Sequence, residues 1–415
     1  MSEISLEAPV VATPNRSALT FIFITVVLDM LALGIIVPVL PKLVVNFLSG
    51  DTARGAEIYG LFGTVWALMH FMFSPLTGLL SDRFGRRPVI LLSNFGLGLD
   101  YVLMAAAPTL SWLFAGRVIS GITSASVPAA SAYIAGVTPP ERRAAAFGMI
   151  GAAFGIGFVV GPALGGLLGS IGPRVPFLAA AALSLGNALY GLFVLPESLP
   201  RSRRSTFRWS KANPVGSLQL LRSSPELVRL AWIKFLGSVA HVVLPSTFVL
   251  YASYRYSWGE RTIGLSLATV GVCSGIVQGA LIGPTVKRFG EHQALLIGLV
   301  FGVLGFAMYG LAPSGPWFWL GLPLTALWGL ANPALQGLMT REVSGREQGQ
   351  LQGANSSLMG IAELIGPGLF TLTFAACIRE GASIHLPGAP FLLASAVLLS
   401  AAALAMGRSR SSARS

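Results

Sequence analysis

The sequence predicts an all-α membrane protein whose twelve transmembrane helices form two six-helix bundles. Three observations predict it: an apolar composition, an internal repeat, and a one-sided distribution of basic residues. Of the 415 residues, 53% are hydrophobic and only 11% are charged, whereas soluble domains carry about 25% charged residues. The composition therefore excludes water as the main solvent of this chain.

Twelve apolar stretches approach the roughly 20 residues that a helix needs to cross a bilayer. Their length and unbroken apolar character favour helices over the alternating strands of a barrel. We expect spans at 17–40, 57–80, 88–107, 110–134, 144–168, 175–195, 229–252, 262–282, 293–312, 316–337, 349–374 and 389–407. The chain then divides into a tail (1–16), an N-terminal bundle (17–195), an Arg- and Ser-rich linker (196–228), a C-terminal bundle (229–407) and a second tail (408–415).

An internal duplication supports the two bundles, because several strings recur at an offset of 205 residues. Arg83-Phe84-Gly85 recurs as Arg288-Phe289-Gly290, and Gly161-Pro162 recurs as Gly366-Pro367. Each predicted half has an even number of spans, so the repeats run parallel, related by an axis along the membrane normal.

The net charge of +12 is explained by topology instead of by nucleic-acid binding. With the N-terminus inside, 20 of the 28 Lys and Arg residues fall on the inner side and six on the outer side. This bias predicts an inner-membrane protein with both termini in the cytoplasm. Residues 1–18 lack a cleavage site, so we expect the first span to be a retained signal anchor. Cys273 and Cys377 both lie in spans, and we expect no disulfide, metal or cofactor.

A polar string separates the second and third spans: Gly78-Leu79-Leu80-Ser81-Asp82-Arg83-Phe84-Gly85-Arg86-Arg87-Pro88. Its glycines let two helix ends approach closely, and its arginines can pair with the carboxylate or cap a neighbouring helix. We expect a loop whose important residues are Gly78, Asp82, Arg83, Gly85, Arg86 and Arg87. The alternative is a positively charged inner loop with an incidental acid.

The fifth span contains an ordered run of small residues around one proline: Gly155, Gly157, Gly161, Pro162, Gly165 and Gly166. Small residues let membrane helices pack backbone to backbone, and a proline removes a helical hydrogen bond. Helix packing alone explains the glycines, but it explains the whole ordered string less well.

The string between spans two and three resembles the loop signature of the major facilitator superfamily, and the fifth span is similar to the antiporter signature of its drug:proton branch. Further strings, including Leu99-Asp100-Tyr101 and Pro333-Ala334-Leu335-Gln336-Gly337, resemble the tetracycline-efflux group over essentially the whole chain. The resemblance implies the major facilitator fold and proton-coupled export of a small drug-like molecule. It also implies a cytoplasmic latch in which Asp82 and Arg86 pair and separate as the bundles rock.

Ionisable residues within the spans are functional candidates, because each costs free energy in a bilayer. They are Asp29, Asp100, Arg117 and Glu363, with His70 and His241 as titratable neighbours, Lys234 near a span edge, and Gln278 and Gln336 as further polar residues of the central cavity. Asp100 and Arg117 lie at similar depths on either side of an outer turn and can meet. Two interpretations of this pair stay open: a structural ion pair that neutralises both charges, and a role in proton coupling. The resemblance favours coupling.

Two departures from the tetracycline-efflux pattern concern the second half. Positions 302 and 274, where that group has a carboxylate and a histidine, hold Gly302 and Ser274. Glu363 is then the deep acid of the second half and a candidate to carry a proton, with pairing to Lys234 as the alternative. Asp29 is a candidate in the first half, because its own span holds no basic residue to neutralise it.

Three other functions are weighed against drug export. A proton symporter or facilitator for a nutrient or metabolite fits the same fold. A transporter-like receptor or scaffold would need a folded module, and the tails and linker are too short for one. An enzyme is not indicated, because the sequence contains no P-loop, no metal-ligand pattern and no Ser-His-Asp set. We therefore expect a small-molecule substrate, protons and the bilayer as partners, no nucleic acid, and a monomer.

Overall fold

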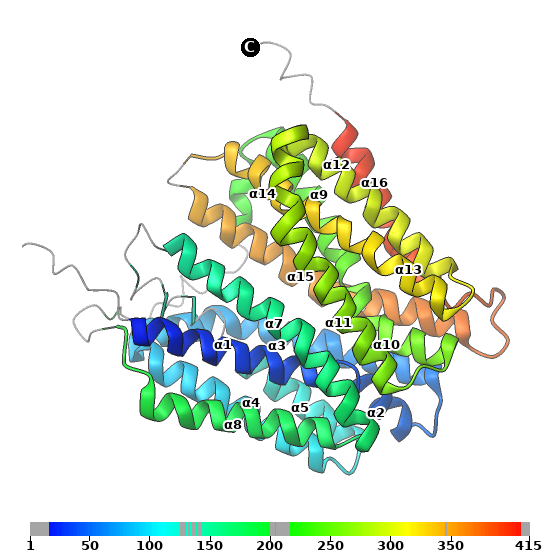
Figure 1. Cartoon of the computed structure of the whole chain (residues 1–415), viewed down its shortest axis with the longest axis horizontal. Helices are drawn as coiled ribbons and strands as arrows, with labels where there is room; N and C mark the ends of the chain where they lie inside the picture. The colour runs from blue at the N-terminus through cyan, green and yellow to red at the C-terminus, as the bar shows by residue number, and fades with distance from the viewer. Residues whose placement is uncertain are drawn as a thin grey trace, which may run out of the picture.

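The structure is a computed structural model, and it describes residues 16–124, 130–131, 133–134, 138, 143–199, 204, 216–344 and 347–407. Within these ranges the secondary structure is helical, with no strand. The helices form two bundles that meet at one end and diverge toward the other (Figure 1). Both predicted tails apart from Arg16, and most of the predicted linker, lie outside the described residues.

The N-terminal bundle follows the predicted spans closely. Its helices are α1 (Arg16–Ile36), α2 (Leu40–Phe47), α3 (Thr52–Phe84), α4 (Arg86–Ala106), α5 (Leu110–Thr123), α7 (Arg143–Ile171) and α8 (Val175–Val194). A polar residue sets the start of α3, where the Asp51 side chain caps the helix by accepting from the Arg54 backbone N–H at 3.0 Å. Predicted span 110–134 is described only in part beyond Thr123.

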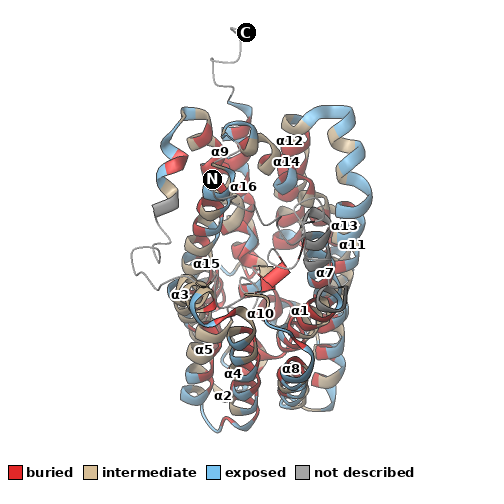
Figure 2. Ribbon diagram, turned by 90° about the vertical axis from the view of Figure 1, so that its left-hand side faces the viewer, coloured by how far each residue is buried: buried red, intermediate tan, exposed pale blue. Residues whose placement is uncertain are grey.

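The C-terminal bundle contains the remaining elements. These are η4 (Gly216–Arg222), α9 (Pro225–His241), α10 (Val243–Tyr256), α11 (Glu260–Ile276), η5 (Val277–Leu281), α12 (Ile282–Leu311), α13 (Gly315–Ala326), η6 (Leu327–Leu330), α14 (Ala331–Arg341), α15 (Gln348–Ile378) and α16 (Ala389–Met406). Its core is aromatic, with the rings of Tyr309 and Phe318 stacked 4.2 Å apart. Buried residues gather inside each bundle, as the view from the left-hand side of Figure 1 shows (Figure 2).

The internal repeat is visible in the backbone. Gly85 (φ +109°) and Gly290 (φ +80°) lie 205 residues apart, and both adopt a conformation that side chains disfavour. α4 and α12 end at Ala106 and Leu311, again at that offset. The loop predicted between spans two and three is wrong: helix runs to Phe84 and resumes at Arg86, so Gly85 alone makes the turn.

Nine helical stretches among the described residues are long and apolar enough to cross a membrane. One of them, Glu260–Leu311, has 52 residues, about 78 Å if straight. It is broken at Gly290 and holds two predicted spans. Two further predicted spans, 110–134 and 316–337, contain the shorter helix α5 and the consecutive helices α13 to α14. The chain is a multi-pass, all-α membrane protein, and the count of twelve crossings stays a prediction.

Candidate functional site

The ordered glycines of α7 lie between two helices, one from each bundle. A Cβ atom on Gly161 would come within 2.8 Å of Gly34 Cα in α1, and one on Gly166 would come within 2.5 Å of the Glu260 carbonyl oxygen at the start of α11. Only glycine fits such approaches. Gly157 and Gly165 also pack on α1, whereas Gly155 has no neighbour within 4 Å of its Cβ position. Close packing therefore explains all but the first glycine of the string.

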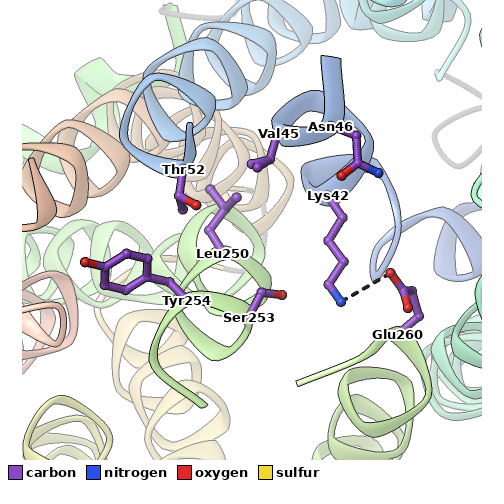
Figure 3. A pocket seen from close by; sticks show the side chains of 8 residues that line it. All are labelled: Lys42, Val45, Asn46, Thr52, Leu250, Ser253, Tyr254 and Glu260. Carbon is purple, nitrogen blue, oxygen red and sulfur yellow. Dashed lines mark ion pairs between the residues drawn. The ribbon is translucent and has the colours of Figure 1, made fainter. Parts of the chain in front are cut away.

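The bundles close on each other at the end opposite the described chain ends, which we call the closed end. Lys42 of α2 pairs with Glu260 of α11 at 3.2 Å, and Lys42 Nζ also donates to the Trp258 carbonyl at 2.8 Å. Glu57 of α3 pairs with Arg379, just after α15. Beside the first pair lies a cavity of about 260 Å³, shown in Figure 3. Its polar lining comes from both bundles.

The opposite end, where α1 and α9 begin and α8 and α16 end, is the termini end. At this end, glycines of α7 and of α11, η5 and α12 face open space. Near the closed end, by contrast, glycines of α7 and α11 pack against a partner helix. No atom of a described residue beyond their own helices lies within 4 Å of the Cβ positions of Gly148, Gly151, Gly275, Gly279 and Gly283. α7 and α11 thus touch near the closed end and separate toward the termini end. The structure is a conformer open at the termini end.

The latch residues lie at this open end. Asp82 is half-buried in the last turn of α3, and it forms no ion pair with Arg86 or any other described residue. Arg87 Nη2 donates to the Leu192 carbonyl at 2.6 Å, so it caps the C-terminal end of α8 as the charge pattern predicts. Arg83 lies over the Phe84 ring at 5.1 Å, and no described residue outside α3 comes within 4 Å of the Gly78 Cβ position.

Sequence reasoning missed Glu197, which follows α8. Its Oε1 accepts the Arg86 backbone N–H at 3.0 Å, and its Oε2 lies 3.9 Å from Arg204. A carboxylate at a helix N-terminus is stabilised by the exposed N–H groups there. Glu197 therefore caps α4 at the turn that carries the latch string. The acid after span six, in Leu195-Pro196-Glu197, was the only signal available.

Asp100 and Arg117 meet inside the N-terminal bundle. Asp100 Oδ2 lies 3.6 Å from Arg117 Nη2, with the carboxylate side chain fully buried and the arginine 12% exposed. Both carboxylate oxygens lack a hydrogen-bond partner within the described residues. Arg117 Nη2 also donates to Met104 Sδ at 3.2 Å, and thioether sulfur is a weak acceptor. The pair therefore neutralises its charge with little other support, and a proton or a conformational change can separate it.

Asp29 also lies inside the N-terminal bundle, where it is 6% exposed. Asn187 Nδ2 of α8 donates to Asp29 Oδ1 at 2.9 Å. The hydrogen-bond pattern turns the Asn94 amide nitrogen of α4 toward the same carboxylate, at 3.2 and 3.1 Å from its two oxygens. Asp29 thus ties α1 to α4 and α8, and amide donors of this kind favour a charged acceptor.

The second deep acid, Glu363, is half-buried on α15 and has no hydrogen bond or ion pair within the described part of the chain. It lies between Gly360, which packs on Phe71 of α3, and Gly366, which packs on Val242. The alternative pairing with Lys234 is not formed: Lys234 Nζ donates to Asn332 Oδ1 at 2.6 Å.

The remaining polar candidates are dispersed. His70 stacks on Trp66 at 5.2 Å within α3, and His241 lies 5.9 Å from Trp328 in the other bundle. Gln336 Oε1 accepts from Asn355 Nδ2 at 2.9 Å. Gln278 is exposed in η5, a π-helical turn.

Gly302 has no room for the carboxylate that the resemblance leads one to look for. A Cβ atom there would come within 2.7 Å of Leu398 and 2.9 Å of the Trp328 ring. Ser274 is half-buried in α11. The indole of Trp328 therefore fills the space that an acid at position 302 would need.

Comparisons with known proteins agree with this architecture. The family model described as Major Facilitator Superfamily matches residues 22–367. The class C tetracycline resistance protein of Escherichia coli is 40% identical over 365 residues, covering 87% of this chain and 91% of that protein. The class G protein of Vibrio anguillarum is 37% identical, with coverage of 87% and 91%.

Solved structures show the same fold. The human organic anion transporter MFSD10 (TETRAN) superposes with a TM-score of 0.69 at 25% identity, covering 95% of this chain and all of that one. The nucleoside transporter NupG superposes with a TM-score of 0.75 at 16% identity, covering 94% and 98%. The second likeness concerns the fold alone.

Proposed function

Since the chain belongs to the major facilitator superfamily and is a tetracycline-efflux-like transporter, we propose that it exports a tetracycline-type drug in exchange for protons. The observation that supports this substrate is 40% identity to a tetracycline resistance protein along 87% of the chain. The nutrient symporter, the receptor and the scaffold have no comparable observation in their favour.

We place the protein in the inner membrane as a monomer, with the termini end in the cytoplasm. The excess of basic residues on that side supports this orientation. The linker 196–228, which connects the two bundles, then lies in the cytoplasm. In this orientation the described conformer is open to the cytoplasm and can take up a drug from it.

Export requires the bundles to close at the termini end and open at the closed end. The ion pairs of the closed end would break in that step, and Asp82 would approach Arg86 as the termini end closes. Asp82→Asn is expected to abolish efflux while the protein still inserts. Normal efflux by a well-expressed variant would show that Asp82 is an incidental acid.

Protons would act at two carboxylates in this scheme. The Asp100 carboxylate is held mainly by Arg117 among the described residues, so protonation releases the arginine and drug binding can compete with it. Glu363 lies on α15 at the contact between bundles, where its charge state can influence rocking. Asp29 serves as a fixed acceptor that holds three helices together, because two amides already occupy it.

The decisive test is Glu363→Gln in proteoliposomes, since glutamine preserves shape and hydrogen bonding but cannot titrate. We expect the variant to bind tetracycline and to lose accumulation driven by a pH gradient. Glu380→Gln, an exposed glutamate beyond the end of α15, is the matched control and should keep wild-type transport. Proton-driven accumulation by Glu363→Gln would remove Glu363 from the mechanism.

A further inference from the structure

Four polar side chains from three helices meet in the C-terminal bundle, and we call them the lysine–amide cluster. Lys234 Nζ of α9 donates to Asn332 Oδ1 of α14 at 2.6 Å, and Asn355 of α15 donates to Gln336 of α14 at 2.9 Å. Asn332 and Gln336 are one turn apart, so they share a face of α14. The two hydrogen bonds therefore belong to one continuous polar surface.

This cluster has unused hydrogen-bonding capacity. Asn355 is 6% exposed, and its Oδ1 and the Gln336 Nε2 are buried without a partner among the described residues. The Lys234 ammonium has three donors and uses one. Buried polar groups are normally satisfied, so the two unpartnered atoms of Asn355 and Gln336 indicate a missing partner beside the lysine.

The cluster also lacks an anion. Within the described chain, no carboxylate lies within 4 Å of Lys234, whereas Arg117 of the other bundle has Asp100 at 3.6 Å. A cation inside a membrane bundle normally pairs with an acid or serves a ligand. The missing partner should therefore carry negative charge.

Two aromatic rings border the same surface. His241 lies two turns beyond Lys234 on α9, and Trp328 lies one turn before Asn332. Their ring centroids are 5.9 Å apart. The exposed Trp232 is about 180° around α9 from His241 at 100° per residue, so the cluster and Trp232 lie on opposite sides of α9. No atom from the described part of the chain outside α9 lies within 4 Å of the nearby Gly237 Cβ position, which leaves space for a ligand.

We propose that the lysine–amide cluster binds an aromatic ligand that bears an ionised carboxylate or enolate, with Lys234 on the anionic group and Trp328 and His241 against the ring. This proposal rests on the proposed function, because it takes the bound ligand to be the molecule that the protein exports. Lys234 supplies a charge-assisted hydrogen bond. Asn332 and Gln336 fix the orientation of the ligand by hydrogen bonding, and the indole at Trp328 provides a flat apolar wall.

The test measures binding of two dyes of opposite charge, the anion fluorescein and the cation rhodamine 6G, to the purified full-length protein by fluorescence polarisation. Lys234→Met is expected to weaken fluorescein binding about tenfold or more and rhodamine binding less than about twofold. Lys234→Arg, which keeps the charge, should stay within about threefold of wild type. Lys287→Met removes the same charge from an exposed site on α12 and should change neither dye.

Wild-type affinity of Lys234→Met for fluorescein, or an equal loss of both dyes, would overturn the proposal. If Lys234→Met does not fold, acetylation of wild-type lysines read by mass spectrometry decides instead. Fluorescein must protect Lys234 and leave Lys287 reactive, and equal reactivity of Lys234 with and without the dye would refute the site.

Tetracycline transport by the wild-type protein is measured separately. Lys234-dependent fluorescein binding without tetracycline export would support the site and defeat the proposed substrate. Tetracycline export together with unchanged fluorescein binding by Lys234→Met would do the reverse.

Discussion

The two bundles share a backbone plan but hold their intramembrane polar groups differently. In the N-terminal bundle, Asp100 faces Arg117 and Asp29 accepts from Asn187, so each buried acid meets a donor from its own bundle. In the C-terminal bundle, the Lys234 ammonium meets an amide and no acid among the described residues. The comparison teaches that duplication preserved the positions where backbone geometry is tightly restricted and left the polar chemistry free to diverge.

The strongest way to break this comparison is to remove one cation from each bundle. Arg117→Met should lower the free energy of unfolding by about 3 to 5 kcal/mol, because it leaves Asp100 buried without a counter-charge. Lys234→Met should change it by less than about 1 kcal/mol, since no described acid depends on it. Thermal unfolding in one detergent measures both.

Adding Asp100→Asn to Arg117→Met should restore most of the lost stability without restoring transport. An equally large loss in Lys234→Met would mean that Lys234 has an acidic partner, and the contrast between the bundles would fail.

Amide residues sharpen the same contrast. Asn187 is 1% exposed and bonded to Asp29, so Asn187→Leu should cost about 1 to 3 kcal/mol by leaving a carboxylate under-satisfied. Asn332 is exposed, and Asn332→Leu should cost below about 0.5 kcal/mol. Denaturant unfolding followed by circular dichroism compares the two. Equal costs would show that Asn187 does not hold Asp29 in the folded protein.

The repeated turn glycines allow a smaller, position-matched comparison. Gly85→Ala and Gly290→Ala each place a side chain at positive φ, at about 1 to 3 kcal/mol. Gly85→Ala should cost about 1 kcal/mol more, because its Cβ would come within 2.8 Å of Glu197 Cδ, whereas nothing lies near Gly290. The control compares Gly85→Ala with its parent in a Glu197→Ala background, where both proteins lack the α4 cap, and there thermal unfolding should give Gly85→Ala the same cost as Gly290→Ala.

The smallest effect concerns the start of α15. Glu347 accepts from the Ser344 backbone at 3.0 Å and from its hydroxyl at 2.7 Å, and these hydrogen bonds lower the pKa of the carboxyl. Because the pKa is lowered in the folded protein, the ionised carboxylate stabilises this turn at pH values above its ordinary pKa. This stabilisation is lost as the pH falls below about 4. The protection factors of amides in the first turn of α15, which correct for the slower intrinsic exchange in acid, should fall there. Glu347→Gln should show no such pH dependence, and a persistent dependence would assign it to another group.

Much of the fold could be predicted from the sequence, because apolar length and repeat offset report directly on helices in a membrane. The 205-residue offset joins Gly85 to Gly290 with the same unusual backbone, as a repeated structural requirement should. The one-residue turn was missed, since a polar string between two spans reads as a loop even when its residues complete the helices on either side.

The candidate site was less accessible to sequence reasoning. Depth along neighbouring spans was sufficient to bring Asp100 to Arg117. It was insufficient for Asn94, Asn187 and Asn355, because asparagines scattered through apolar stretches carry no period that shows which helix each one faces. Lys234 was recognised, but its partner Asn332 lies 98 residues away and depends on how α9 packs on α14.

The crowding around Gly302 sets an order on the changes by which this chain could evolve. An aspartate or glutamate arising at position 302 would meet Trp328 and Leu398 at once, so that substitution is unfavourable in the present background. Leu398 approaches with a terminal methyl that can rotate away, whereas the Trp328 ring cannot, so a smaller residue at position 328 would have to come first. It would remove the indole that borders the lysine–amide cluster. The chain can thus gain an acid in α12 or keep its present ligand surface, but one change works against the other. In a library that varies positions 302 and 328 together, functional clones with an acid at position 302 should all have lost the tryptophan at position 328.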